Sequence, residues 1–250
     1  MPQKTTLYVI YMPYSLDEYN IGHLHTTCCV SMREANGGMR VSVLENKPAT
    51  HEVLGDCQFT VKLLDFANKV PGIFRAVAPS GSLTMTEVSY NAFPKCLTMY
   101  TSGALSEKKF TARIDTMFFP DYRPAVDPFE NLPAAESCEV LDLFRDVQLA
   151  VPGPGKELKD LTGKYPVGWE QKGGKVMTIF KRLQVDFHMT FLGKRYIGDI
   201  ERFIRKIFIQ GHQEVLQLED EWKDMTMDDV RKEEERIQKE LAEKYPPKQR

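Results

Sequence analysis

A lysine lies in the middle of an otherwise apolar face of a strand-like segment, residues 177–191. Alternate side chains of a strand point to the same side. One side places Lys181 between Ile179 and Leu183, whereas the other side is mostly polar. This alternation predicts a half-buried antiparallel strand. Because an unpaired ammonium in an apolar interior is costly, Lys181 requires an anion, either a protein carboxylate or a ligand phosphate.

A second charge in an unexpected place lies near the C-terminus, on a predicted helix that begins after Thr226. Thr226 is a suitable N-cap, and Asp229 has the spacing of a capping box. Apolar residues then recur at helical spacing, except that Glu234 occupies one position of the apolar stripe. Two interpretations stay open: a glutamate at the rim of the helix, or a partner for Lys181.

Further polar groups fall on the faces of other predicted strands. In residues 57–65, Thr60 and Lys62 share a face, and in residues 109–119, Thr116 interrupts an apolar face. Lysines and hydroxyls suit a phosphate, and a carboxylate suits the hydroxyls of a sugar or an inositol. Such groups could converge in a largely apolar ligand pocket between a curved sheet and its helices. The pattern is equally compatible with a packed core that contains one buried ion pair.

No arrangement of residues in the sequence indicates catalysis. The chain lacks a phosphate loop followed by Lys-Ser or Lys-Thr, a GxSxG elbow and an HExxH motif. Cys96, beside Lys95, is interpreted as a structural cysteine rather than an activated thiol. His23 and His25 lie two positions apart on a predicted helix and face different ways, with no third ligand in place. We therefore expect no enzyme activity, no metal and no cofactor.

Composition limits the class of protein. The chain has 250 residues, 42% hydrophobic and 27% charged, which is typical of a globular protein. A net charge of −2 gives no basic field that would attract nucleic acid. The five cysteines lack CxxC spacing and indicate free thiols in a reducing compartment. Without a signal pattern, or an apolar run of roughly 18 residues, the chain is expected to be cytoplasmic.

The elements that must position these residues form one large antiparallel sheet with helices packed over it. This is an α+β fold, predicted to be a single domain over residues 1–250. Ser15 and Glu18 mark a capping box at the start of the first helix. The predicted strands are 5–13, 39–46, 57–65, 83–92, 95–102, 109–119, 137–151 and 177–191; the helices are 15–34, 69–78, 194–220 and from 226 onward; the long loops are 120–136 and 152–175. The tail, residues 245–250, is expected to be disordered.

Several segments together resemble the phosphatidylinositol transfer protein family. They follow in order along nearly the whole chain, and no single motif carries the resemblance alone. The matching segments are 17–19 (DEY), 58–62 (QFTVK), 69–71 (KVP), 78–83 (APSGSL), 90–96 (YNAFPKC), 114–116 (IDT) and 221–235 (EWKDMTMDDVRKEEE). The resemblance implies a START-like fold, in which a large curved antiparallel sheet and long helices enclose a single lipid cavity. The bound phospholipid would be cargo rather than a cofactor.

The resemblance also assigns candidate site residues by position. Those that would hold the inositol ring are Thr60, Lys62, Asn91 and Glu234. Those around the lipid phosphate are Thr98, Thr116, Lys181 and His23, the last where the family often has a glutamine. The membrane-docking loop would be Met189, Thr190, Phe191 and Leu192, where animal members carry two tryptophans. Since tryptophan favours the bilayer interface, docking would be weaker or anchored differently here.

The function that the resemblance implies is a carrier that binds one phosphatidylinositol and exchanges it between membranes. Phosphatidylcholine stays open as a second ligand, because Gly211 replaces a phenylalanine associated with the choline headgroup. We expect a monomer that associates transiently with membrane surfaces and binds no nucleic acid. The alternative is a lipid sensor or presenter that stimulates phosphoinositide kinase signalling with little bulk transfer. The acidic loop 127–139 is compatible with that alternative.

Overall fold

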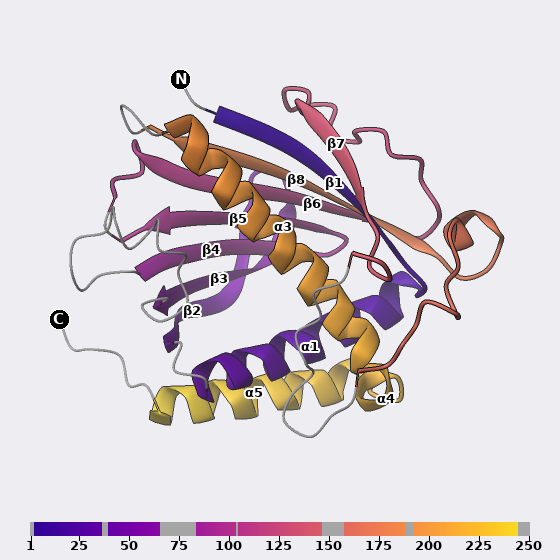
Figure 1. The fold of residues 1–250 in the computed structure, drawn as a ribbon. Helices are drawn as coiled ribbons and strands as arrows, with labels where there is room; N and C mark the ends of the chain where they lie inside the picture. The colour runs from indigo at the N-terminus through magenta and orange to yellow at the C-terminus, as the bar shows by residue number, and fades with distance from the viewer. Residues whose placement is uncertain are drawn as a thin grey trace.

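Eight strands form one sheet in the computed structural model, and long helices cover one of its faces (Figure 1). The structure describes residues 3–36, 40–65, 84–103, 105–146, 158–188 and 193–244. The strands are β1 (Gln3–Met12), β2 (Arg40–His51), β3 (Gly55–Asp65), β4 (Thr84–Ala92), β5 (Lys95–Ser102), β6 (Phe110–Phe119), β7 (Ser137–Leu141) and β8 (Met177–Phe187). The helices are α1 (Leu16–Asn36), α3 (Gly193–Gln217), α4 (Glu219–Trp222) and α5 (Met227–Lys244), with a 3-10 turn at Trp169–Gln171.

The strand order in the sheet is β2-β3-β4-β5-β6-β8-β1-β7. All neighbouring pairs are antiparallel except β1 and β7, which run parallel. The expectation of a large α+β sheet is confirmed, with this parallel pair as its one departure from an antiparallel sheet. Three predictions lie entirely outside the described residues: the short helix 69–78, the docking loop 189–192 and the disordered tail 245–250. The predicted segments 137–151, 152–175 and 177–191 lie partly outside them.

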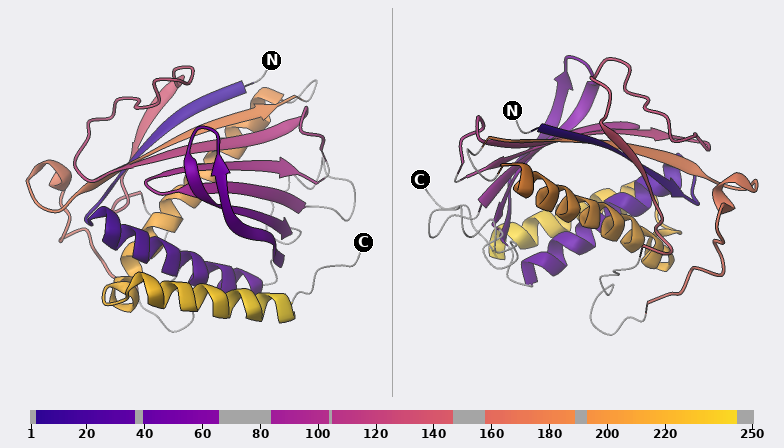
Figure 2. Two further views of the ribbon diagram at one scale, coloured as in Figure 1. Left: turned by 180° about the vertical axis from the view of Figure 1, so that it is seen from behind. Right: turned by 45° about the horizontal axis from the view of Figure 1, so that its top comes forward.

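The helices form a layer on the inner face of the sheet. α3 runs obliquely across the strands, and α1 and α5 lie side by side next to it (Figures 1 and 2). Alternate residues of β1, β6 and β8 pack against α3 in the main core, among them Ile10, Ile114 and Leu183 with Ile200. Within the described part of the chain, no helix has both the length and the apolar character needed to cross a membrane.

The outer face is also covered over β1, β6 and β8. Thr178, Phe180 and Arg182 are at most 1% exposed, although the alternation of β8 predicted a half-buried strand with a polar outer side. The cause is the loop 120–136, which folds back over the sheet and packs Phe129 into a second cluster with Phe180. Backbone carbonyls of this loop accept hydrogen bonds from the Thr178 hydroxyl (2.8 Å) and the Arg182 guanidinium (2.6 Å). The half-buried prediction is therefore wrong for this part of the strand.

Strand β2 forms one edge of the sheet and is irregular. Its pairing with β3 shifts register between Val43 and Glu45, which is a β-bulge. Pro48 lies within the strand, a position that a proline tolerates at an edge because it has no N–H to donate. The Lys47 ammonium lies 2.6 Å from the Glu45 carboxylate on this exposed strand.

Both predicted capping boxes are present. At the start of α1, Ser15 Oγ accepts from the Glu18 backbone N–H (3.3 Å), and the Glu18 carboxylate accepts from the Ser15 backbone N–H (2.8 Å). At the start of α5, Thr226 and Asp229 make the same reciprocal pair at 3.3 and 3.0 Å. These bonds satisfy backbone donors that a helix start leaves without intrahelical partners.

The strand predicted over 137–151 is shorter than expected and ends at Leu141. Asp142 follows, and its carboxylate accepts from the backbone N–H of Phe144 (3.0 Å) and of Arg145 (3.2 Å). An aspartate that bonds the backbone two and three residues on favours a turn over an extended strand. The local side-chain bond therefore ends the strand, although apolar residues continue beyond it.

Helices α1 and α4 approach closely where Gly22 faces the Trp222 indole. A Cβ on Gly22 would lie 2.6 Å from Trp222 Cε2, and the indole is held by its Nε1 donating to the Val215 carbonyl at 2.9 Å. We expect Gly22→Ala to lower the free energy of unfolding by about 1–3 kcal/mol, because overpacking outweighs the helix propensity of alanine. Urea denaturation measures this change.

The matched control for Gly22→Ala is Gly211→Ala in α3. Gly211 is exposed, and an added Cβ there would meet nothing within 4 Å. Alanine at this helical position should raise the free energy of unfolding by up to about 1 kcal/mol. If both substitutions raise the free energy of unfolding, the α1–α4 contact accommodates an added methyl group more easily than its geometry indicates.

Candidate functional site

The sheet register brings three predicted site residues into one row across the inner face. Thr116 on β6 lies opposite Lys181 on β8 and opposite Cys96 on β5, and Cys96 lies opposite Asn91 on β4. Residues directly opposite each other share a face of the sheet. The row faces the helices, since the Lys181 ammonium lies 5.1 Å from the centre of the Phe208 ring on α3.

A second polar row lies beside the first. Thr60 on β3 is opposite Ser89 on β4, which is opposite Thr98 on β5. The hydroxyl oxygens of Ser89 and Thr98 lie 3.4 Å apart. The predicted strand residues that share the inner face are therefore Thr60, Lys62, Asn91, Thr98, Thr116 and Lys181.

Lys62 has a protein partner on the neighbouring strand. Its ammonium lies 3.2 Å from the Glu87 carboxylate, which also accepts a 2.7 Å hydrogen bond from the Tyr100 hydroxyl. The charge of Glu87 raises the pKa of Lys62 against the opposing effect of burial. Lys62 is therefore a fixed cation within the site, oriented by Glu87.

Lys181 differs from Lys62 in lacking such a partner. No carboxylate of the described residues lies within ion-pair distance of its ammonium. Burial lowers the pKa of Lys181 to about 8, so the ammonium is mostly charged at neutral pH. Its neighbours are the ring of Phe208 and the hydroxyl-bearing row that contains Thr116. The side chain thus presents a positive charge to the inner face, and the described residues provide no carboxylate as its counter-ion.

Two histidines border this charge through a stack of rings. His23 stacks on Tyr19 with ring centres 5.5 Å apart, and Tyr19 stacks on His212 with centres 6.2 Å apart. Burial and the nearby Lys181 lower the pKa of His23 to about 4, and the pKa of His212 falls well below its usual value for the same reasons. Both imidazoles are therefore neutral at neutral pH.

His212 is a site residue that sequence reasoning missed. Its Nδ1 lies 2.6 Å from the Phe208 carbonyl and donates to it, because a carbonyl only accepts. Its buried Nε2 has no hydrogen-bond partner among the described residues. In the neutral ring Nε2 is therefore a hydrogen-bond acceptor close to the inner polar rows.

The signal that could have found His212 is the helical spacing of apolar residues in α3. This spacing also allows a stripe through Ile207 and Gly211, but Ile207 is 45% exposed and Gly211 is exposed as well. Phe208 and His212 face the sheet in their place, both about one-twentieth exposed, at 6% and 5%. Steps of four residues from Ile204 lead to these positions and would have found them.

Glu234 lies at the rim of α5. It makes an ion pair with Arg231 one turn earlier, and its side chain is 23% exposed. The rim interpretation is therefore confirmed, and the alternative that Glu234 is the partner of Lys181 is wrong. Its charge is still close enough to α1 to contribute to the raised pKa of Cys28. Its assignment to the inositol ring stays a prediction.

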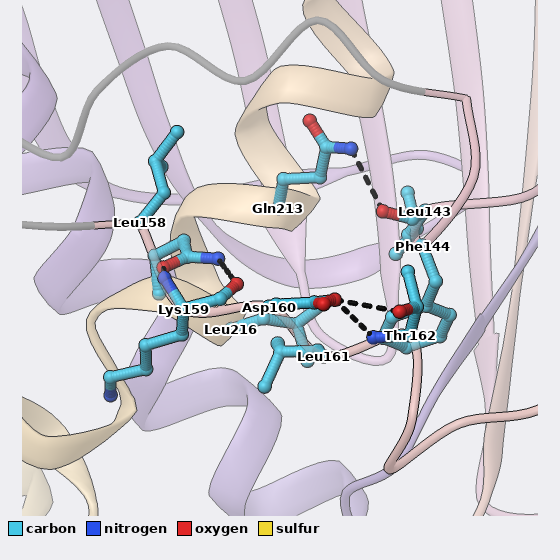
Figure 3. A pocket seen from close by; sticks show the side chains of 10 residues that line it. Leu143, Phe144, Leu158, Lys159, Asp160, Leu161, Thr162, Gln213 and Leu216 are labelled. Carbon is cyan, nitrogen blue, oxygen red and sulfur yellow. Dashed lines mark hydrogen bonds between the residues drawn. The ribbon is translucent and has the colours of Figure 1, made fainter.

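A separate pocket of about 200 Å³ lies between the C-terminal half of α3 and the segments around Phe144 and Leu161 (Figure 3). Gln213 and Gln217 on its α3 side donate to the backbone carbonyls of Leu143 and Lys159. The pocket contains none of the predicted site residues. It is also far too small for a molecule with two acyl chains.

The inner polar rows lie where the sheet is least filled. Every residue of β4 is half-buried, whereas β6 alternates between buried and half-buried residues along its length. In a strand packed on one side and solvated on the other, successive residues would alternate between buried and exposed. The side chains around Thr60, Asn91 and Thr98 are therefore reachable on the inner side. Cations and hydroxyls on such a face, next to an apolar core, suit an amphipathic molecule with an anionic head.

Comparison with known proteins identifies the family of this chain. The family model described as phosphatidylinositol transfer protein matches residues 3–239. Membrane-associated phosphatidylinositol transfer protein 1 of Homo sapiens is 32% identical, over 95% of this chain and 20% of its own length. Cytoplasmic phosphatidylinositol transfer protein 1 of Homo sapiens is 30% identical, over 96% of this chain and 75% of its own length. The protein retinal degeneration B of Drosophila melanogaster is 27% identical, over 95% and 21%.

This chain belongs to the phosphatidylinositol transfer protein family. It spans about a fifth of the membrane-associated relatives and three quarters of the cytoplasmic one.

Proposed function

We propose that this chain binds one phosphatidylinositol against the inner polar rows and exchanges it between membranes. The observation that carries the proposal is Lys181, a partly buried ammonium with no carboxylate partner among the described residues. A lipid phosphate supplies the missing anion. Family membership supports the choice of ligand, because the family is described by transfer of phosphatidylinositol rather than by a reaction.

The proposed pose places the phosphate between Lys181, Thr98 and Thr116, with His23 at its border. The inositol ring then lies toward Lys62, Thr60, Asn91 and Glu234. Charge-assisted bonds from an ammonium to phosphate are stronger than neutral ones, and they offset the cost of removing the headgroup from water. Each buried methylene of the acyl chains contributes about 0.8 kcal/mol, so unaided escape of a lipid from a bilayer is slow.

Transfer makes and breaks no covalent bond, so we propose neither an enzyme activity nor a cofactor for it. We propose that the protein is a cytoplasmic monomer. It would associate transiently with membranes through the predicted docking loop 189–192. A relative named as cytoplasmic supports this setting. We favour transfer over the sensor or presenter role, since the family is described by transfer.

Mass spectrometry of lipids that copurify with the protein is the direct test, first under native conditions and then after extraction. A one-to-one complex with phosphatidylinositol supports the proposed ligand, and phosphatidylcholine beside it makes Gly211 compatible with choline. An empty protein that also takes up no lipid from vesicles would contradict the proposal. Fluorescent phosphatidylinositol moving between two vesicle populations then measures transfer, and slow exchange with stimulated kinase output would favour the presenter role.

Thr60→Glu should reduce the initial rate of phosphatidylinositol transfer at least tenfold. The new carboxylate would enter the inner row beside Ser89 and repel the phosphoinositol headgroup. Thr86→Glu is the matched control, because Thr86 lies on β4 with its side chain on the opposite face of the sheet. Equal losses in both variants would indicate a general effect on folding, and circular dichroism of each variant checks that the fold is retained.

A further inference from the structure

Three potential metal ligands meet where α1 faces α4. His25 and Cys29 lie four residues apart on α1 and therefore on one face of the helix. Glu221 of α4 completes a group whose ligand atoms all lie within 4.8 Å of one another. The expectation of no metal site rested on His23 and His25 facing different ways. The third ligand, however, comes from a distant part of the chain.

Two distances within the group are close to those of tetrahedral zinc. Cys29 Sγ lies 3.4 Å from His25 Nε2, and Glu221 Oε2 lies 3.9 Å from the same nitrogen. With zinc bonds of about 2.0–2.3 Å, adjacent ligand atoms of a tetrahedral site are about 3.3–3.6 Å apart. One of the two distances falls in this range, and the other requires a shift of a few tenths of an ångström by an exposed side chain.

The His25 imidazole is oriented for this role by Glu233 of α5. Nδ1 of His25 lies 2.6 Å from Glu233 Oε2, and a carboxylate accepts, so Nδ1 carries the proton. The lone pair of Nε2 then points toward Cys29 and Glu221. A carboxylate that holds the far nitrogen of a histidine ligand is a recurrent support of zinc sites.

The three candidate ligands differ in their exposure to solvent. His25 is buried, Cys29 is half-buried, and the Glu221 side chain is 38% exposed. Zinc could enter from the Glu221 side, and water from the same side would fill the fourth position. The charges also balance, since a thiolate and one carboxylate neutralise a divalent ion.

We propose that His25, Cys29 and Glu221 bind a zinc ion, with Glu233 as the residue that positions His25. The ion would fasten α1 to α4 about one helical turn from the contact between Gly22 and Trp222. Its role is structural: it would hold together the helix layer that covers the inner face of the sheet. This inference is independent of the proposed lipid transfer.

Titration of the metal-free full chain with Co²⁺ and then Zn²⁺ tests the proposal. We expect one equivalent of Co²⁺ to give a near-ultraviolet thiolate-to-metal absorption and the visible bands of a tetrahedral ion, both lost on adding Zn²⁺. Zn²⁺ should also raise the melting temperature of the wild type. Absence of the thiolate band would overturn the proposal and leave the Cys29–His25 contact as an ordinary hydrogen bond.

Single substitutions locate the ion. Cys29→Ser should weaken Zn²⁺ binding at least 100-fold and abolish the rise in melting temperature. Glu233→Gln should weaken binding about 10–100-fold while the thiolate band persists. The controls are the adjacent Cys28→Ser, whose side chain packs against α5, and the exposed Cys138→Ser. Wild-type affinity in Cys29→Ser, or loss of the thiolate band in Cys138→Ser, would contradict the assignment.

Discussion

Lys181→Met should slow phosphatidylinositol transfer at least tenfold and at the same time stabilise the lipid-free protein. A charge-assisted hydrogen bond contributes about 1.5–3 kcal/mol, so its loss should slow transfer by at least tenfold. Without lipid, the ammonium has no carboxylate partner among the described residues, and burial lowers its pKa to about 8. Removing a charge that burial disfavours should raise the free energy of unfolding by about 1–3 kcal/mol, as the side chain is half-buried.

The stability difference between Lys181→Met and the wild type should depend on pH with a defined sign. The pKa of Lys181 is lower in the folded chain, about 8, than its ordinary value of 10.5. Folding therefore disfavours the charged form, and the penalty is complete below pH 8 and vanishes above about pH 10.5. The advantage of the methionine variant should accordingly shrink across this interval, measured by urea denaturation of delipidated protein at several pH values.

The control for Lys181→Met is Lys172→Met, at an exposed position. This substitution should change neither transfer nor stability by more than about 0.5 kcal/mol. A Lys181→Met variant that is less stable than the wild type would argue against an unpaired charge at this position. Undiminished transfer would argue against phosphate as its anion.

Lys62→Ala should also remove phosphatidylinositol transfer, but it should lower stability. The Lys62 ammonium neutralises Glu87, whose side chain is only 16% exposed. Leaving this carboxylate unpaired should cost about 1–3 kcal/mol, with one hydrogen bond from Tyr100 remaining. Because Glu87 raises the pKa of Lys62, the stabilisation is fully present at neutral pH and is lost only above the ordinary lysine range.

A double variant separates the two effects of Lys62. Lys62→Ala with Glu87→Gln removes the cation and the unpaired carboxylate together, so unfolding should return toward the wild-type midpoint. Transfer should stay low, because the headgroup still lacks its cation. Lys47→Ala, at an exposed position on β2, is the matched control with little expected change in either measurement. Recovery of transfer in the double variant would mean that Lys62 acts only through Glu87.

Local sequence rules predicted much of the fold and of the site. Strand alternation marked Thr60, Lys62, Thr116 and Lys181, and the register gathers them on one face. Side-chain parity and helix caps depend on neighbours close in sequence, which explains why they could be read directly. The resemblance to the family added Asn91, which lies in the same row.

The features that escaped prediction depend on residues distant in sequence. Strand alternation placed Arg182 on the polar side of β8, which was expected to face solvent. In the structure the loop 120–136 covers it. His212 was missed because the sequence of the helix allows either position 211 or position 212 to face the sheet. Only the direction in which α3 crosses the sheet selects His212. The group around His25 was missed because Glu221 joins it through the packing of α4 on α1. Predicting any of these three features would have required knowledge of the tertiary packing between distant segments.

The irregular strand β2 has a consequence for the proposed lipid exchange, which would uncover an apolar interior at each membrane encounter. A straight, unpaired strand edge is a template on which other chains add and aggregate. Here the bulge at Val43–Glu45, the missing N–H of Pro48 and the charged pair of Lys47 with Glu45 interrupt that template. In such an open state this edge would resist growth of an intermolecular sheet, so that collision with a second open molecule would be less prone to end in aggregation.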